Sequence, residues 1–233
     1  GLGLTANNNG KIIVSRVYFR PWDPPAPGDE NPWPGVNGTS HGVHTASIAA
    51  GDIVTATYDG LNIGEISGVA PKAYVMSYRV FYASVTHNES AYSTELIAAL
   101  EDMVKDGADA VNNSWGGGPL GSGGRFDPLD QALVNAVKAG VFVSMAAGND
   151  GPGLGTGDHP SPEYIDVAAS TTSGTFAAGR LNITAPTPVD PNLQNLPFGT
   201  AEFGPPLPVA QVINYPFIWA GAVDPNNVNG CAA

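Results

Sequence analysis

Apolar residues occur in short runs and at helical spacing over roughly the first 170 residues of the chain. Residues 91–106 carry apolar side chains at positions 96, 97, 100, 103 and 104, which is the spacing of one helix face. Small apolar residues at 44–50 predict a short helix that packs closely against its surroundings. Short runs rich in branched and aromatic residues predict buried strands. These predicted strands are 11–19, 73–81, 109–114, 141–147 and 163–170.

Residues typical of helix ends support two longer predicted helices, one over 91–106 and one that begins at Pro128. Gly107 follows the first of them, at the position where a left-handed C-terminal cap belongs. Asp127 is a suitable N-cap for the second, and Pro128 fits its first helical position. The second helix is predicted to stop at Gly140.

The order of these elements predicts an α/β fold with a parallel β-sheet flanked by helices. Strands that alternate with helices of this length are joined by right-handed crossovers. In such sheets, ligands bind beyond the carboxyl ends of the strands. Two of these ends carry small residues, WGGG at 115–118 and AAGND at 146–150, which let another backbone approach closely.

The chain changes character after about residue 172. Residues 184–216 are rich in Pro, Asn and Gly without a clear period, whereas 174–183 and 209–223 look β-like. We predict one α/β domain over residues 1–183. Residues 184–233 are predicted to be a linker and the start of a β-rich insert.

Composition and charge limit the class of protein. The chain has 233 residues, of which 42% are hydrophobic, so a packed core can form. Nine Lys and Arg against 21 Asp and Glu give a net charge of −12, which argues against a nucleic-acid partner. No run of 18 apolar residues is present, so no membrane span is predicted. Cys231 is the single cysteine, which excludes a disulfide within the chain.

Candidate chemistry begins in the stretch SHGVHTASIAAG. His41 lies where a loop meets the predicted helix, and an imidazole held there can act as a general base; a solvated loop histidine is the alternative. His44 favours a structural role, because no HExxH pattern or carboxylate completes a zinc site. Asn149 follows a buried strand, where its amide can stabilise an oxyanion or simply form a turn. His87 and His159 are lone loop histidines without an assigned role.

Four segments, in order, resemble the subtilisin-like serine proteases, the subtilases. SHGVHTASIAAG resembles the family's histidine motif, and GVAPKAYVMSYRVF resembles the connection to the next strand. VNNSWGGG resembles the strand whose end forms one wall of the primary specificity pocket. VFVSMAAGNDG resembles the strand and loop that carry the oxyanion asparagine. Four ordered segments are far more specific than any one of them alone.

The resemblance implies a role for each matching residue. His41 matches the catalytic histidine, Asn149 the oxyanion-hole asparagine and His44 a structural histidine of the family. The matching substrate-binding residues are Ser114, Trp115 and Gly116 on one wall and Ala147 and Gly148 on the other. Trp115 either rims the pocket or packs on the core. Ser40 and Val43 replace the usual Gly and Thr, and we expect the backbone to tolerate them. The substrate is expected to lie extended against an exposed edge near 77–83 and 114–116.

Two parts of the family's catalytic triad have no match. A subtilase triad needs Asp, His and Ser in that chain order. Neither Asp23 nor Asp29 lies in the family's D-[ST]-G turn, and the only GTS, which ends at Ser40, precedes the histidine. We therefore expect the chain to be the central part of a larger protease, without the Asp and Ser segments. Its C-terminal end weakly resembles the start of a protease-associated insert.

The resemblance implies a serine endopeptidase that cleaves polypeptides through an acyl-enzyme. It implies no required cofactor and no catalytic metal, with structural calcium as a common family feature. Secretion or a cell-surface location follows from the family, with further segments of the same protease or other copies as partners. The alternative is a catalytically inactive subtilase-fold protein with a structural or surface-assembly role. A different α/β hydrolase would need a G-x-S-x-G elbow, which the sequence lacks.

Overall fold

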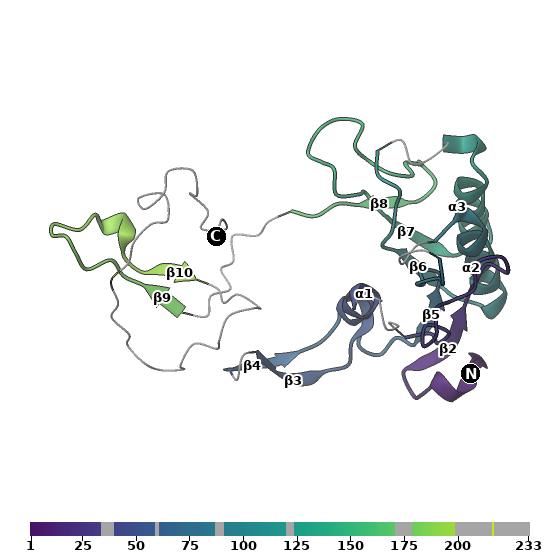
Figure 1. Ribbon diagram of the computed structural model, residues 1–233, viewed down its shortest axis with the longest axis horizontal. Helices are drawn as coiled ribbons and strands as arrows, with labels where there is room; N and C mark the ends of the chain where they lie inside the picture. The colour runs from purple at the N-terminus through teal and green to yellow at the C-terminus, as the bar shows by residue number, and fades with distance from the viewer. Residues whose placement is uncertain are drawn as a thin grey trace. The chain divides into compact units, whose positions relative to one another are not determined.

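The computed structural model describes most of the chain. The described residues are 1–33, 40–58, 61–86, 91–119, 124–170, 179–198 and Pro216. The chain forms two compact units, residues 1–56 with 63–171 and residues 57–62 with 172–233. Figure 1 shows the helices and strands of both units.

Among the described residues of the first unit, two parallel sheets of three strands form the centre. Their strand orders are β1-β2-β5 and β6-β7-β8, and every neighbouring pair is parallel. The strands are β1 (Leu2–Gly3), β2 (Ile12–Val17), β5 (Val75–Arg79), β6 (Ala110–Asn113), β7 (Phe142–Ala146) and β8 (Ile165–Val167). The predicted α/β class with parallel strands and flanking helices is confirmed. The sequence pattern does not predict β1, nor the division into two sheets.

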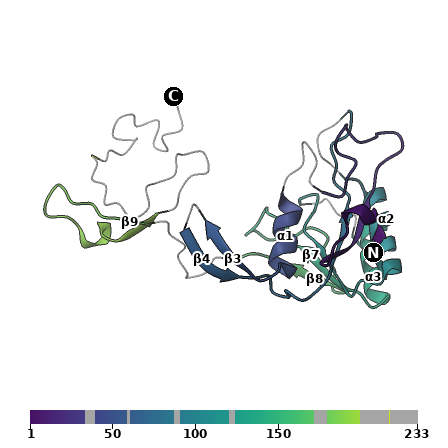
Figure 2. The same ribbon diagram turned by 90° about the horizontal axis from the view of Figure 1, so that it is seen from below.

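Three α-helices flank these strands in the described part of the first unit. They are α1 (His41–Ala50), α2 (Ser93–Asp106) and α3 (Pro128–Lys138). Two short 3-10 helices, η1 (Thr5–Asn7) and η2 (Gly124–Phe126), lie in the connections. Figures 1 and 2 both show α2 and α3 together on one side of the strands and α1 on the other. The strands are therefore the middle layer of three.

Local sequence signals decide where the helices begin and end. Gly107 adopts a φ of 83° and its N–H bonds to the last carbonyls of α2, so it closes that helix as predicted. Asp127 caps α3, because its side chain accepts hydrogen bonds from two N–H groups of the first turn. The helix α1 begins at His41, earlier than residue 44, where its small apolar residues predict the start.

The core lies between the strands and the pair α2 and α3. Leu133 of α3 and Met145 of β7 are 0% exposed, and Met103 of α2 is almost as deeply buried. The rest of this cluster is Val80, Leu96, Ala99, Leu100, Leu129, Ala136, Val141, Val143 and Tyr164. Both helices turn their apolar rows toward the strands, so most of the hydrophobic burial occurs on this face.

The α1 side of the strands is much less covered. Within α1, Ala50 is buried, whereas Val43 and Ile48 remain about half exposed. On the strands, Phe142 of β7 and Ile165 of β8 are also about half exposed. In β7 the exposed Phe142 precedes the buried Val143, because successive side chains of a strand point to opposite faces, whereas β8 is exposed at all three positions. The two faces of the strand layer therefore differ in how completely they are packed.

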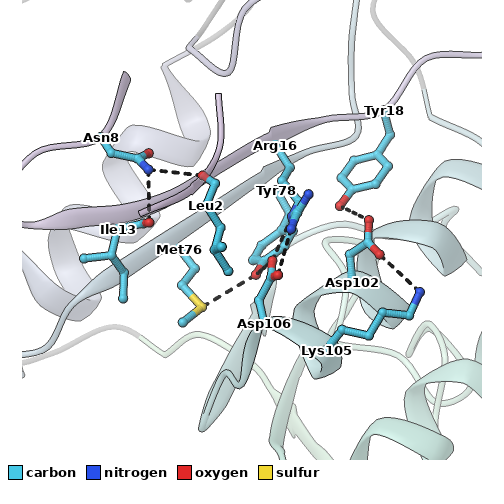
Figure 3. A network of polar contacts seen from close by, with 10 residues as sticks. All are labelled: Leu2, Asn8, Ile13, Arg16, Tyr18, Met76, Tyr78, Asp102, Lys105 and Asp106. Carbon is cyan, nitrogen blue, oxygen red and sulfur yellow. Dashed lines mark hydrogen bonds and ion pairs between the residues drawn. The ribbon is translucent and has the colours of Figure 1, made fainter. Parts of the chain in front are cut away.

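A polar network joins β2 and β5 to the end of α2 (Figure 3). Arg16 of β2 donates two hydrogen bonds of 2.8 Å to the carboxylate of Asp106, and Tyr78 of β5 donates a third, also 2.8 Å. Tyr18 donates to Asp102 one turn earlier on α2, at 3.1 Å. The hydrogen bonds from Arg16 hold the pKa of Asp106 below its ordinary value, because they favour the charged carboxylate.

Smaller sheets lie outside this core. β9 and β10 pair in antiparallel fashion, with Leu196 opposite Leu181, and β3 and β4 form another two-stranded sheet. The bounds are β3 (Val54–Tyr58), β4 (Leu61–Ile66), β9 (Gly179–Leu181), η3 (Pro191–Leu193) and β10 (Leu196–Phe198). β9 confirms the β character of the end of 174–183, whereas 209–223 lies outside the described residues except for Pro216. The sequence pattern does not predict β3 and β4, and the predicted boundary after residue 183 stays a prediction.

Candidate active site

Two loop segments leave the same edge of the second sheet. β6 and β7 pair in parallel, with Asn113 opposite Met145, so the chain leaves both strands in the same direction at neighbouring points. The segments that follow are 114–116 and 147–149. All the predicted site residues except His41 lie in these two segments. The structure therefore brings six of the seven to one edge of a parallel sheet, where α/β proteins place their ligands.

The first segment is held by its neighbours in the fold. Asn112 donates a side-chain hydrogen bond of 2.8 Å to the Ser114 hydroxyl. Trp115 is half-buried and packs against the core cluster, with its ring edge-on to that of His159 at 5.5 Å between centroids. Of the two alternatives for Trp115, the described contacts favour packing on the core. Its contact with substrate stays a prediction, as do those of Ser114 and Gly116.

The second segment begins as an extension of β7. The Ala147 N–H bonds to the Val167 carbonyl at 3.0 Å, which continues the pairing with β8. Gly148 has a φ of 86°, a conformation that strongly favours glycine. Asn149 comes next and is exposed. Its side chain is therefore accessible to a substrate, and its role as an oxyanion donor stays a prediction.

Asp158, which the sequence analysis does not single out, reaches into the first segment. One of its carboxylate oxygens accepts hydrogen bonds from the backbone N–H groups of Gly117 and Gly118. A Cβ at Gly116 would overlap this carboxylate, so a larger residue at that position would displace the Asp158 side chain. The sequence signal for this contact is weak, because an acidic residue in a glycine-rich loop usually marks a turn.

His159 is buried, which contradicts its description as a lone loop histidine. Its Nδ1 shares a hydrogen bond of 2.5 Å with Asp130 of α3, and its Nε2 lies 3.7 Å from the free oxygen of Asp158. Tyr164 donates a hydrogen bond of 2.6 Å to the His159 carbonyl. Burial raises the pKa of nearby Asp166, while His159 acts in the opposite direction. Nothing in the local pattern of the sequence predicts that Asp130 and His159 meet, and His87 lies outside the described residues.

His41 opens α1, and its side chain is exposed together with that of His44 one turn later. Among the described residues, the close packing expected for the small residues of α1 is seen at the end of the helix. There Gly68 lies so near the helix backbone that a Cβ would come within 2.8 Å of the Ala50 nitrogen. The neighbouring Val69 N–H also bonds to the Ile48 carbonyl at 2.9 Å. The helix is thus fixed at its far end, with its histidine end accessible.

Asp23 and Asp29 take part in structural ion pairs. Asp23 bonds to Arg20 at 3.2 Å, and Asp29 lies 2.8 Å from Arg79. Asp29 also accepts the Ala83 N–H at 2.6 Å, while the Ala83 carbonyl accepts the Ala26 N–H. The backbone of Ala83 is therefore already paired, and the exposed substrate edge expected near 77–83 is wrong at its C-terminal end.

The described residues do not form a recognisable metal or membrane site. No three His, Cys, Asp or Glu side chains in the described ranges come together in a way that could hold a metal ion. No residue is therefore assigned to calcium. None of the helices in this part of the chain is both long and apolar enough to cross a bilayer.

The first unit is an α/β domain in which two strand ends that each contain a glycine lie at one edge of a parallel sheet, and in which a histidine opens a helix. Residues 13–193 match the subtilase family, and the chain belongs to that family.

Several plant proteins are similar to part of the chain. It is 39% identical over 138 residues to subtilisin-like protease SBT2.2 of Arabidopsis thaliana, covering 58% of this chain and 16% of that protein. It is 36% identical over 143 residues to subtilisin-like protease SBT3 of Solanum lycopersicum, covering 59% and 17%. The chain thus spans about a sixth of the length of these relatives. The solved structure of sphericase shows a partial likeness, with a TM-score of 0.42 and 27% identity over 59% of this chain and 43% of that one.

Proposed function

We propose that this chain contributes to a serine endopeptidase of the subtilase type. The observation that carries the proposal is that two strand ends which each contain a glycine, 114–116 and 147–149, follow paired strands at one edge of a parallel sheet. A glycine at a strand end leaves room for an extended peptide to approach its backbone. Membership of the subtilase family supports the same chemistry.

In the proposed reaction, the hydroxyl of a catalytic serine attacks the carbonyl carbon of the peptide bond. His41 accepts the hydroxyl proton and then gives it to the leaving amine, so an acyl-enzyme remains. Asn149 donates its amide N–H to the oxyanion that forms on the carbonyl oxygen. Water then attacks the acyl-enzyme, with His41 again as the base. No Ser or Asp of the described residues is assigned to the remaining triad positions.

The exposure of both groups is compatible with these roles. His41 and Asn149 are each open to solvent, so a substrate can reach them. The substrate side chain next to the cleaved bond would lie between Ser114–Gly116 and Ala147–Gly148. Apolar side chains fit best there, because small residues make up most of these walls. Secretion or cell-surface display and structural calcium belong to the same proposal.

A fluorophosphonate probe tests the proposal on the full-length protein. The folded protein should be labelled at a single serine, because such probes react with activated serine hydroxyls. His41→Ala should slow labelling by about 1,000-fold or more, since the serine loses its base. His44→Asn, a change three residues away on the same exposed helix, should keep the label. Asn149→Ala should lower kcat on a peptide about 100- to 1,000-fold with little change in KM.

Two results would contradict the proposal. A folded, full-length protein that is not labelled is no serine peptidase, and the inactive structural or surface-assembly alternative would then hold. Equal loss of labelling in His41→Ala and His44→Asn, with both variants folded, would overturn the assignment of His41 as the base.

A further inference from the structure

We propose that Asp158, His159 and Asp130 form a positioning unit that fixes the backbone of Gly116–Gly118, one wall of the substrate site. The proposal rests on the proposed peptidase function and names residues that the family resemblance does not assign. None of the three is expected to touch the reacting atoms. They would act through the strand end that they hold.

The first step is the contact between Asp158 and the glycine-rich segment. Asp158 is 2% exposed, and a single oxygen of its carboxylate accepts the N–H groups of both Gly117 and Gly118. Hydrogen bonds from backbone N–H groups to a buried carboxylate are stronger than bonds between neutral groups. Glycine has the largest backbone freedom of all residues, so three consecutive glycines need an external partner to hold one conformation. Asp158 is such a partner.

The second step is the support of Asp158 itself. Its other oxygen is buried and makes no hydrogen bond among the described residues, and His159 Nε2 lies 3.7 Å away. His159 is 4% exposed and is anchored through Nδ1 to Asp130, which is also buried at the start of α3. The imidazole therefore lies between two carboxylates and connects the strand end to a core helix.

The third step is the fit of the neighbouring side chains. Trp115, the residue that precedes the three glycines, packs its ring against His159. Tyr164 fixes the His159 backbone through its hydroxyl. The residue before the glycine segment is thus in contact with the same loop that holds Gly117 and Gly118. A change in this loop should shift the wall of the substrate site without altering His41 or Asn149.

Asp158→Ala in the full-length protein tests the unit. The two glycine N–H groups lose their acceptor, so the strand end should loosen. KM for an extended peptide substrate should rise about 10-fold or more, with kcat within about threefold of the wild type. The rate of fluorophosphonate labelling should stay within about threefold, because the small probe does not depend on the extended wall. Glu163→Ala, which removes an exposed carboxylate from the same loop, is the matched control and should change none of these values.

The link through His159 is tested by a double-mutant cycle. Asp130→Ala alone should raise KM in the same direction but less, by about threefold. Asp130→Ala combined with Asp158→Ala should be no worse than Asp158→Ala alone, because both changes break one chain of contacts. Additive effects in this cycle would overturn the unit.

The outcomes separate this proposal from the proposed function. If the wild type is not labelled, the peptidase proposal fails. If the wild type is labelled and Asp158→Ala keeps the normal KM, the positioning unit is wrong while the peptidase proposal stands. If Asp158→Ala does not fold, Asp158→Asn replaces it. Its neutral amide oxygen is a weaker acceptor than the carboxylate, so KM should rise by about threefold with the labelling rate unchanged, whereas a KM equal to that of the wild type would contradict the proposal.

Discussion

The two faces of the strand layer differ in how completely their side chains are buried. On one face, α2 and α3 cover the strands, and Leu133 and Met145 lose all contact with solvent. On the other face, α1 remains mostly exposed, and the strand residue Phe142 is 55% exposed. Stability in the described residues is therefore concentrated on the α2 and α3 side. The histidine of the proposed site lies on the open side, where burial contributes little to holding it.

Core truncation should show the largest difference between the two faces. Leu133→Ala removes a fully buried side chain of α3 and should lower the free energy of unfolding by about 3–4 kcal/mol. Ile48→Ala on α1 is the matched control. Ile48 is 56% exposed and Ala has the higher helix propensity, so the free energy of unfolding should change by less than about 0.5 kcal/mol. Denaturant unfolding of both variants measures the contrast.

A large loss of stability in Ile48→Ala would identify a contact of α1 that the described residues do not show. If Ile48→Ala costs as much as Leu133→Ala, then a part of the protein outside the described residues covers α1 in solution. The contrast between the two faces would then be a property of the described residues and not of the whole protein. The unfolding midpoint and slope should be compared for both variants, because a changed slope indicates a change in the surface exposed on unfolding.

The next effect concerns the polar network at the end of α2 and its dependence on pH. Asp106 has a lowered pKa in the folded protein, chiefly because Arg16 donates to its carboxylate. Its contribution to stability is therefore present above the ordinary pKa of an aspartate and is lost as pH falls through the lower folded value. Asp106→Asn should cost about 2 kcal/mol near pH 7, and the difference between the two proteins should shrink as the pH falls below the ordinary pKa of an aspartate.

Unfolding measured from pH 7 down to pH 2.5 tests this prediction. Asp102→Asn is a useful control, because Asp102 lies one turn away on α2 and accepts one bond from Tyr18 at 3.1 Å and one from the exposed Lys105 at 3.2 Å. It should show a smaller loss of stability at pH 7. A constant difference between the wild type and Asp106→Asn over the whole range would show that the charge of Asp106 does not contribute.

The sequence predicts the closed face much better than the site. Helical spacing and capping residues suffice for α2 and α3, because Gly107 and Asp127 act on their immediate neighbours. The strands β2, β5, β6 and β7 are also predicted locally, because each lies within a short run that contains branched apolar residues. β3 does alternate apolar and polar residues, but the prediction relied on buried apolar runs, and both β3 and β4 are largely exposed.

The contacts around the candidate site depend on residues that are distant in the chain. Asp158 reaches Gly117 across 41 residues, and His159 reaches Asp130 across 29 residues. No periodicity links such pairs, since each contact depends on how the loop after β7 folds back over the end of β6. Similarity to the subtilases assigns His41 and Asn149 by their motifs. It does not assign the buried groups that hold the surrounding backbone.

The smallest predicted effect concerns helix N-caps. It compares the cap of α3, on the closed face, with that of α1, on the open face. Asp127→Ala should lower the free energy of unfolding by about 1 kcal/mol, because two N–H groups at the start of α3 lose their acceptor. Ser40→Ala is the matched change at the start of α1. The Ser40 side chain makes no capping hydrogen bond, so this variant should differ from the wild type by less than about 0.3 kcal/mol. Both are measured by thermal and denaturant unfolding. An equal loss in the free energy of unfolding of the two variants would show that Ser40 caps α1 in solution. The open face would then be more stable than its exposure indicates.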